Sequence, residues 1–511
     1  MKLLAKLEKT KIFWWITTLC VLFFFLRIPS LIEPYWYGDE GIYEVIGRAL
    51  NHGELLYRDI WDNKPPFLYV TYALFDGNQS SVKFLSLIVG ALSLILFYFL
   101  AQKVLNSQRA SIITTFLFLI LLGTPILEGN IANAENFTIL PILIAGFLIY
   151  NLTSIHETKI KKEKTSSIFN LKIFVVGLLI GIAFLYKIVA IFDFAAFFLF
   201  FILSNLSPHF SLSLIRKAHK YRLWNKRLIF DLLSMILGFV LPLLFTILYF
   251  FSQHALHIFF QSVFSDNVSY VAWQNTFLGI SQGLLILKFV ILIVSLAIIV
   301  WKRKALSKPT LFIFLWLIFS LFNAFFSERP YTHYALVLLP SFCLLTGLLF
   351  IKQTNKKRAG IFIYIAVIAS IVFVQFKPNI SWSYRYYVNI ISFLTGKEST
   401  EQYQIFFDPK VPRDYAVASF IKDNTSSSQQ VFIWGNNPQI YILSDKIPPG
   451  KYTVAYHIIQ NNAFRQTQQM LIQTKPKYVI VLKETQPLPF VLPLYIMRYN
   501  LAGTTIYERS I

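Results

Sequence analysis

The sequence predicts an all-α polytopic membrane protein with a small α/β domain at its C-terminal end, and three observations predict this class. First, 56% of the 511 residues are hydrophobic and only 14% are charged, whereas soluble domains carry about 25% charged residues. Second, long apolar runs recur along the chain, and third, Lys and Arg gather between them. Both cysteines, Cys20 and Cys343, lie in apolar runs, which excludes a disulfide framework and a cysteine-based metal site.

The apolar runs predict about eleven membrane-spanning helices, since about 20 apolar residues cross a bilayer as a helix. The fifth run has 34 residues, which is about 50 Å as one straight helix and too long for one crossing. Because Tyr186-Lys187 interrupts it, we predict a hairpin with its turn near Lys187. The runs lie at residues 12–28, 82–100, 110–127, 137–152, 171–204, 229–251, 278–300, 310–326, 334–351 and 360–376.

The distribution of positive charge predicts the orientation. Lys and Arg in short loops mark the cytoplasmic side, so the basic loops 153–172 and 205–228 place both ends of the fifth run inside. The N-terminus is then inside and the C-terminus outside. Six basic segments hold 25 Lys and Arg and three acidic residues, which equals the whole net charge of +22. Nucleic acid is therefore not needed as a partner to explain the charge.

The two ends of the chain have different characters. No small-residue cleavage site follows the run 12–28, so we interpret it as a retained span and not as a signal peptide. After residue 377 polar residues and prolines appear, with β-like runs at Val431–Trp434 and Tyr478–Leu482. We predict a transmembrane module at 1–377, with a first outer loop at 29–81, and an extracytoplasmic α/β domain at 378–511.

The predicted topology brings acidic residues to the outer face, and Asp39 stands out among them. It follows the first span and has Glu40 beside it. Partial desolvation and a like charge raise the pKa of a carboxyl group, and such a group can accept a proton from a hydroxyl. The alternative is an ordinary solvated loop acid.

Cations and polar groups occur at the same face. Lys64, fixed by Pro65-Pro66, suits a lipid phosphate, although a lysine that extends to the interface is an equal alternative. Arg58 and Arg329 permit the same two interpretations, and a guanidinium can hold phosphate with two donors. Lys187, a charge within an apolar run, is a further functional candidate. Other candidates for substrate binding are Tyr43, Glu128, Tyr331 and His333.

The sequence does not decide whether the protein binds a metal ion. His254 and His257 lie three residues apart with Asp266 nearby, yet no HExxH pattern supports a metal. A divalent cation is a possible cofactor, and none is certain.

Several motifs together resemble those of the GT-C superfamily of membrane glycosyltransferases, in the branch of protein O-mannosyltransferases and lipid A aminoarabinose transferases. The first is Asp39-Glu40 with Tyr43 three residues on, and the second is Asn63-Lys64-Pro65-Pro66-Phe67-Leu68. Arg329-Pro330-Tyr331-Thr332-His333-Tyr334 and the run Val431–Gly435 resemble later motifs of bacterial members.

This resemblance implies an inverting transferase, hexosyl or pentosyl, in a bacterial plasma membrane. It would move a sugar from a polyprenyl-phosphate donor to a hydroxyl of a protein, lipid or surface glycan at the outer face. By position, Asp39 would be the catalytic base, Glu40 would orient the acceptor and Lys64 would steady the phosphate. Relatives often carry Glu where this chain has Asn63, which leaves the metal requirement open.

Two other functional classes are alternatives. A multispan transporter or lipid flippase would show paired halves and ionisable groups near the bilayer midplane, whereas here the charges lie mostly at the outer ends and no half repeats the other. A polymerase or ligase acting on lipid-linked glycans is less well supported, because the Asp-Glu loop follows the first span directly.

Overall fold

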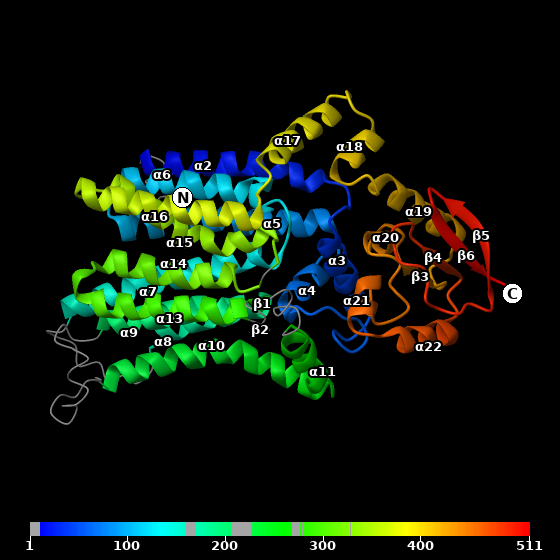
Figure 1. The fold of residues 1–511 in the computed structure, drawn as a ribbon, viewed down its shortest axis with the longest axis horizontal. Helices are drawn as coiled ribbons and strands as arrows, with labels where there is room; N and C mark the ends of the chain where they lie inside the picture. Colours follow the sequence, from blue (N-terminus) through cyan, green and yellow to red (C-terminus); the bar gives the residue numbers. More distant parts are fainter. Residues whose placement is uncertain are drawn as a thin grey trace, which may run out of the picture.

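The computed structural model describes residues 11–159, 170–205, 226–267, 276–277, 280–281, 283–327 and 329–510. Figure 1 shows long helices lying side by side in a bundle, with the C-terminal region, defined as residues 378–510, against one end. We call this the cavity end of the bundle, because a cavity of about 340 Å³ lies there. The chain is helical throughout the bundle, and its larger sheet lies in the C-terminal region.

The bundle contains, among the described residues, one helical segment for each predicted span. Eight segments are long and apolar enough to cross a membrane by length and composition, and α6, α8 and α14 are shorter. This confirms the polytopic class, while the number of crossings and their orientation stay predictions. The segments are α2 Lys11–Arg27, α5 Gln79–Leu105, α6 Gln108–Gly123, α7 Ala134–Lys159, α8 Leu171–Tyr186, α9 Ile191–Asn205, α10 Lys226–Ser252, α13 Gly283–Lys302, α14 Lys308–Ala324, α15 Leu339–Gly347 flanked by η7 Thr332–Leu338 and η8 Leu348–Phe350, and α16 Asn355–Phe376.

The long apolar run breaks at the predicted place. Helix α8 ends at Tyr186, and Lys187 has extended backbone angles (φ −154°, ψ 121°) before the short helix η3 at Ile188–Ala190. Helix α9 then starts at Ile191. The break places Lys187 at the cavity end, in the turn between the two helices.

Glycines allow helices α8 and α10 to pack in close contact. A Cβ atom built on Gly177 would lie 1.9 Å from the carbonyl oxygen of Met235, and one on Gly238 would lie 2.0 Å from that of Phe174. Small residues let helix backbones approach in membranes, where apolar burial between helices adds little. The contact therefore has no room for a side chain on either glycine.

The first outer loop is largely helical. It contains η1 at Ile28–Ile32, α3 at Gly38–Asn51 and α4 at Pro66–Ala73. Neither α3 nor α4 was predicted from the sequence. Helices α3 and α4 share one apolar core with strands of the C-terminal region, in which Ile46, Tyr72 and Ile433 are each at most 4% exposed. The C-terminal region is thus fixed directly on the first outer loop.

The C-terminal region is an α/β structure with a four-stranded sheet in the order β3-β4-β6-β5. Strands β3 Val431–Trp434 and β4 Tyr478–Val481 are parallel, with Val431 opposite Tyr478, and they confirm the two predicted strands. Antiparallel β6 Thr504–Arg509 and β5 Tyr495–Leu501 complete the sheet. Its helices are α17 Ile380–Leu394, α18 Thr400–Phe407, α19 Val411–Asn424, α20 Gln439–Leu443, α21 Ala455–Gln460 and α22 Phe464–Thr474.

Short elements complete the cavity end. Helix α11 at Leu256–Phe260 and the π-helical turn η5 at Gln261–Ser265 follow α10, and β1 Thr276–Phe277 pairs with β2 Ile280–Ser281. The remaining short turns are η2 Pro125–Leu127 and η6 Arg303–Ala305.

The packing of α8 on α10 predicts a specific loss of stability. We expect Gly177→Ala and Gly238→Ala each to lower the melting temperature of the purified protein, because the added methyl group must push the two backbones apart. Gly360→Ala is the matched control, since a Cβ at that position of α16 meets nothing within 4 Å and alanine favours a helix. Equal melting temperatures for all three variants would contradict the close contact.

Candidate functional site

A cavity of about 340 Å³ lies at the cavity end of the bundle. The first outer loop, the starts or ends of bundle helices and α21 of the C-terminal region all contribute to its wall. Its apolar lining comes mainly from the bundle. The lining residues are Asp39, Tyr43, Trp61, Asp62, Asn63, Lys64, Pro65, Asn133, Ala134, Glu135, Lys187, Ile188, Val189, Asn267, Asn323, Phe326, Ser327, Arg329, Tyr331, His333, Tyr334, Val337, Tyr456, His457 and Gln460.

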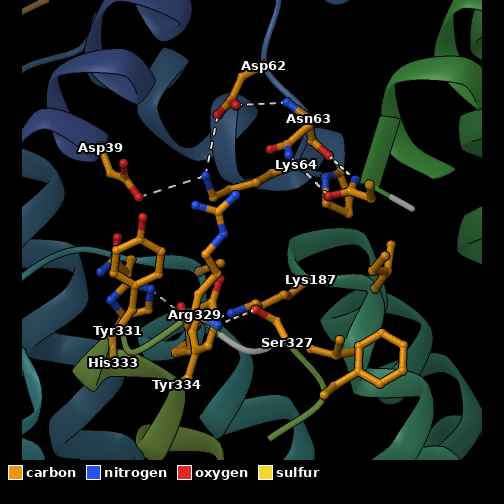
Figure 2. Close-up of a pocket in the computed structure, with 18 of the residues that line it drawn as sticks. Asp39, Asp62, Asn63, Lys64, Lys187, Ser327, Arg329, Tyr331, His333 and Tyr334 are labelled. Atoms are coloured by element: carbon orange, nitrogen blue, oxygen red, sulfur yellow. Dashed lines mark hydrogen bonds and ion pairs between the residues drawn. The ribbon is translucent and has the colours of Figure 1, made fainter. Parts of the chain in front are cut away.

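Lys64 lies between two carboxylates in this cavity. Its Nζ is 3.9 Å from Oδ2 of Asp39 and 3.6 Å from Oδ2 of Asp62, as Figure 2 shows. The ammonium group also lies 4.9 Å from the centre of the Tyr43 ring, and the Tyr43 hydroxyl donates to Asp39 over 3.2 Å. Asp39 and Lys64, which the sequence singled out separately, are therefore direct neighbours.

The local sequence fixes the backbone of Lys64. Pro65 is extended (φ −61°, ψ 160°) and Pro66 begins α4, where a missing N–H has no consequence. The Tyr57 hydroxyl donates to the carbonyl oxygen of Lys64 over 2.6 Å, and the Lys64 N–H donates to the Tyr69 hydroxyl over 3.2 Å. These contacts hold the backbone of Lys64 in place.

Asp62 is a site residue that the sequence reasoning missed. It is 2% exposed and accepts from the Tyr69 hydroxyl over 2.7 Å and from the Asn63 N–H over 2.8 Å. Burial opposes ionisation, yet the charge of Lys64 and these hydrogen bonds hold the pKa of Asp62 below its usual value. Asp62 is thus a fixed anion next to the ammonium group of Lys64.

Two further cations face the same cavity. Lys187 forms an ion pair with Glu135, and its Nζ lies 4.0 Å from the centre of the Tyr334 ring. Figure 2 shows Arg329 directed into the space between Lys64 and Lys187. Asp39, Asp62 and Glu135 line the same cavity, so the cations can bind an anionic group of a ligand where they point into the cavity.

A hydrogen-bonded group holds His333 at the cavity wall. Its Nδ1 is 2.7 Å from Oε2 of Glu128, and Glu128 also accepts from the hydroxyls of Tyr37, over 2.8 Å, and Thr332. Burial of Glu128 would raise its pKa, but His333 and these hydroxyls lower the pKa to about 2. Glu128 lies behind the wall and orients His333, so the sequence prediction that it contacts substrate finds no support in its position.

The structure brings most of the predicted site residues together. Asp39, Tyr43, Lys64, Lys187, Arg329, Tyr331 and His333 all line the cavity. Their common placement was not deducible from the sequence, because they come from the first outer loop, the α8–α9 turn and the segment before α15.

Glu40 does not face this cavity, and its predicted role in orienting the acceptor needs correction. Successive residues of a helix point about 100° apart, so Glu40 of α3 turns into the protein while Asp39 faces the cavity. Glu40 is 1% exposed, lies 3.1 Å from Nζ of Lys83 and accepts from the Ala132 N–H over 2.7 Å. It therefore anchors the loop to the bundle.

Arg58 also lies outside the cavity, in contrast to its predicted contact with the donor phosphate. Its guanidinium forms hydrogen bonds to Asp59 over 2.7 and 2.8 Å, and the side chain is 48% exposed. Arg58 borders a different hollow, next to Lys451 and α22. The reason is that Tyr57 is in the left-handed conformation (φ 69°), which turns the chain at this point.

The C-terminal region supplies Tyr456, His457 and Gln460 of α21 to the cavity, which the sequence did not indicate. His457 is 3% exposed, and its ring centre lies 4.9 Å from that of Trp61. Its Nε2 is 3.8 Å from Oδ1 of Asp62. Burial lowers the pKa of His457 to about 4 despite the nearby Asp62, so the imidazole is neutral at pH 7.

Among the described residues, no group of three or more His, Cys, Asp or Glu side chains is placed to hold a metal ion. His254 and His257 do not line the cavity. At the position where relatives often carry Glu, the Asn63 side chain donates to Asn267 over 3.1 Å, and Asn267 donates to the Asn63 carbonyl oxygen over 2.7 Å. The described donors therefore do not indicate a metal centre here.

Comparisons with known proteins agree with this architecture. Residues 65–220 match the family model described as dolichyl-phosphate-mannose-protein mannosyltransferase. No curated protein sequence matches the chain.

Solved structures resemble the chain over nearly its whole length. ArnT from Cupriavidus metallidurans bound to undecaprenyl phosphate has 12% identity and a TM-score of 0.54, covering 96% of this chain and 97% of that one. The apo state of the same ArnT has 12% identity and a TM-score of 0.51, with 98% of each chain covered. The apo oligosaccharyltransferase of Archaeoglobus fulgidus has 14% identity and a TM-score of 0.48, covering 93% of this chain and 70% of that one. The chain thus has the fold of ArnT, and the match of residues 65–220 to the mannosyltransferase family model agrees with the motifs that resemble those of the GT-C membrane glycosyltransferases.

Proposed function

We propose that this protein is an integral-membrane inverting glycosyltransferase. It moves a sugar, a hexose or a pentose, from a polyprenyl-phosphate donor to a hydroxyl acceptor at the outer face of a bacterial plasma membrane. One observation carries the proposal: a carboxylate, Asp39, and three cations, Lys64, Lys187 and Arg329, line one cavity at the end of a bundle of apolar helices.

The cations suit the leaving phosphate. When the bond between the anomeric carbon and the phosphate oxygen breaks, negative charge grows on that oxygen, and fixed cations in a site of low dielectric stabilise it strongly. Arg329 can bind with two donors, whereas Lys64 and Lys187 act as point charges. The cocrystallised undecaprenyl phosphate of ArnT and the dolichyl phosphate in the name of the matched family support a lipid phosphate as the donor.

The apolar lining suits the lipid that carries this phosphate. Ile188, Val189, Phe326 and Val337 line the cavity on the bundle side. The first isoprene units can lie against these side chains while the phosphate reaches the cations. A lipid donor needs no nucleotide site, and the sequence contains neither a P-loop nor a Rossmann glycine motif.

Asp39 is the group placed to act as base. Its side chain is 38% exposed, so an acceptor can reach it. In a single displacement the acceptor oxygen forms the bond to the anomeric carbon, its proton passes to Asp39, and the phosphate leaves with the bonding electron pair. Tyr43, which donates to Asp39, fixes the direction of the carboxylate.

We also propose that the two parts of the chain have different roles in the reaction. The module at 1–377, with its loop at 29–81, would bind the donor and carry the reacting groups. The domain at 378–511 would cover the cavity from the outer side and meet the acceptor first, through Tyr456 and Gln460 of α21.

Removal of the base tests the reaction directly. We expect Asp39→Asn to lower the transfer of a radiolabelled sugar from undecaprenyl phosphate by at least about 100-fold, the usual contribution of a general base, while binding of undecaprenyl phosphate persists. Asp76→Asn is the control, because Asp76 lies in the same loop, is 59% exposed and does not line the cavity. Undiminished transfer by Asp39→Asn would reject Asp39 as the base.

Removal of a cation separates donor binding from chemistry. We expect Lys64→Met to weaken binding of undecaprenyl phosphate in nanodiscs by about 10-fold or more, which corresponds to about 1.4 kcal/mol, since a charge-assisted contact with phosphate is lost. Lys422→Met, at an exposed position of α19, should bind like the wild type. Identical affinities of the two variants would mean that Lys64 does not hold the phosphate.

A further inference from the structure

An apolar stripe runs along helix α17 and has no protein neighbour to cover it among the described residues. Its side chains recur at intervals of three or four residues, which places them on one face of a helix. They are unusually exposed for their size: Ile380 61%, Tyr384 72%, Val388 42%, Ile391 59% and Leu394 67%.

The other face of α17 is firmly packed, so the stripe does not result from a loosely attached helix. Tyr386 and Ile390 form a buried cluster with Tyr403 and Phe407 of α18. The Tyr386 hydroxyl donates to Glu33 over 2.6 Å, and Glu33 in turn accepts from the buried ammonium group of Lys83 in α5 over 2.8 Å. Helix α17 is therefore held to the bundle in one orientation.

The position of α17 directs the stripe toward the bilayer. The helix begins four residues after α16 ends, and Figure 1 shows it running obliquely away from the cavity end of the bundle, beside the end of α2. The hydroxyl of Tyr387, which borders the stripe, donates to the carbonyl oxygen of Leu26 in the last turn of α2 over 3.0 Å. The stripe thus lies beside the end of a membrane-spanning helix.

Other apolar side chains close to the stripe are exposed as well. Near the same end of α2, Phe25 is 64% exposed, Ile28 39% and Ile32 45%. A lipid surface would meet both areas, because α2 is long and apolar enough to span a membrane and α17 contacts its last turn. A contiguous exposed apolar area marks a site of contact with a membrane or another molecule.

The composition of α17 also fits the interface between lipid and water. Trp382, Tyr384 and Tyr387 are the residue types enriched at that depth. Arg385 is exposed next to the stripe, and Lys377 precedes the helix, where each can meet lipid phosphates. Amphipathic helices of this kind bury their apolar face at the boundary between headgroups and acyl chains.

We propose that α17 is an interfacial membrane anchor. Its stripe lies among the upper acyl chains of the leaflet at the cavity end, and its polar edge meets the lipid headgroups. Through the cluster with α18, the anchor holds the C-terminal region, and with it α21, at a fixed height over the cavity.

Site-directed fluorescence tests the occupant of the stripe. In a background with Cys20→Ala and Cys343→Ala, single cysteines at Val388 and Ile391 carry an environment-sensitive NBD label in nanodiscs. We expect blue-shifted emission at both positions and stronger quenching by lipids with a nitroxide at carbon 5 of the acyl chain than at carbon 12. A label at Lys422, exposed on α19, serves as the control in water.

Two results would overturn this proposal. Emission at 388 and 391 equal to that at 422 would show that the stripe faces water. Blue-shifted emission without lipid quenching, lost when each nanodisc holds a single copy, would show that a second copy of the chain covers the stripe.

The anchoring role has its own test. We expect the double variant Val388→Gln and Ile391→Gln in nanodiscs to be cleaved faster by protease at residues 395–399, between α17 and α18. The reason is that the polar side chains weaken the binding of α17 to the lipid. Tyr384 and the buried face of α17 are unchanged in this variant, and far-UV circular dichroism checks that the helices persist. Unchanged cleavage would refute the anchoring role, even if the labels report lipid.

Discussion

The pairing of Lys64 with the buried carboxylate of Asp62 is the interaction on which the cavity depends. A buried carboxylate without a cation is strongly destabilising, and Asp62 is 2% exposed, so Lys64 has to remain within reach of it. Pro65, Pro66 and Tyr57 fix the Lys64 backbone, and the ammonium group also lies 3.9 Å from Asp39 in the cavity. In its proposed role at the donor phosphate, Lys64 would be held in place before the ligand binds, which lowers the entropy lost on binding.

A second network of buried charges holds the loop that carries Asp39. Lys83 of α5 is fully buried and lies 2.8 Å from Glu33 and 3.1 Å from Glu40, and Glu40 also accepts from a backbone N–H at Ala132. Glu44, one turn further along α3, is completely buried too, and burial beside Glu40 raises its pKa well above the usual value. Asp39 and Glu40, although adjacent, differ in position: Asp39 faces the cavity, and Glu40 holds α3 against the bundle through Lys83.

The sequence predicts what depends on local composition and misses what depends on side-chain direction and distant contacts. Apolar runs located the helices of the bundle and the break at Lys187, and β-branched runs located β3 and β4. Strands β5 and β6 were missed, since five central residues of β5 are exposed and show no alternation of apolar and polar residues. The resemblance implied an acceptor-orienting role for Glu40, and its burial beside Lys83 could not be predicted, because adjacency to Asp39 says nothing about the face of an unpredicted helix. His457 could not be found, because it lies 395 positions from Asp62 and only the folded chain brings them together.

The two sides of the cavity differ in a way that suits the proposed single displacement. Inversion requires the nucleophile and the leaving group on opposite faces of the sugar. The bundle supplies Ile188, Val337 and the cation Lys187, a surface for an anion on a lipid. The C-terminal region supplies Tyr456 and Gln460, neutral groups that can form hydrogen bonds to a hydroxyl without attracting a second phosphate. Asp39 lies between these sides and next to Lys64, so an acceptor that enters beside α21 meets the base before it meets the cations. Since Lys64 lies 3.9 Å from Asp39, a bound phosphate would compete with this carboxylate for the ammonium group.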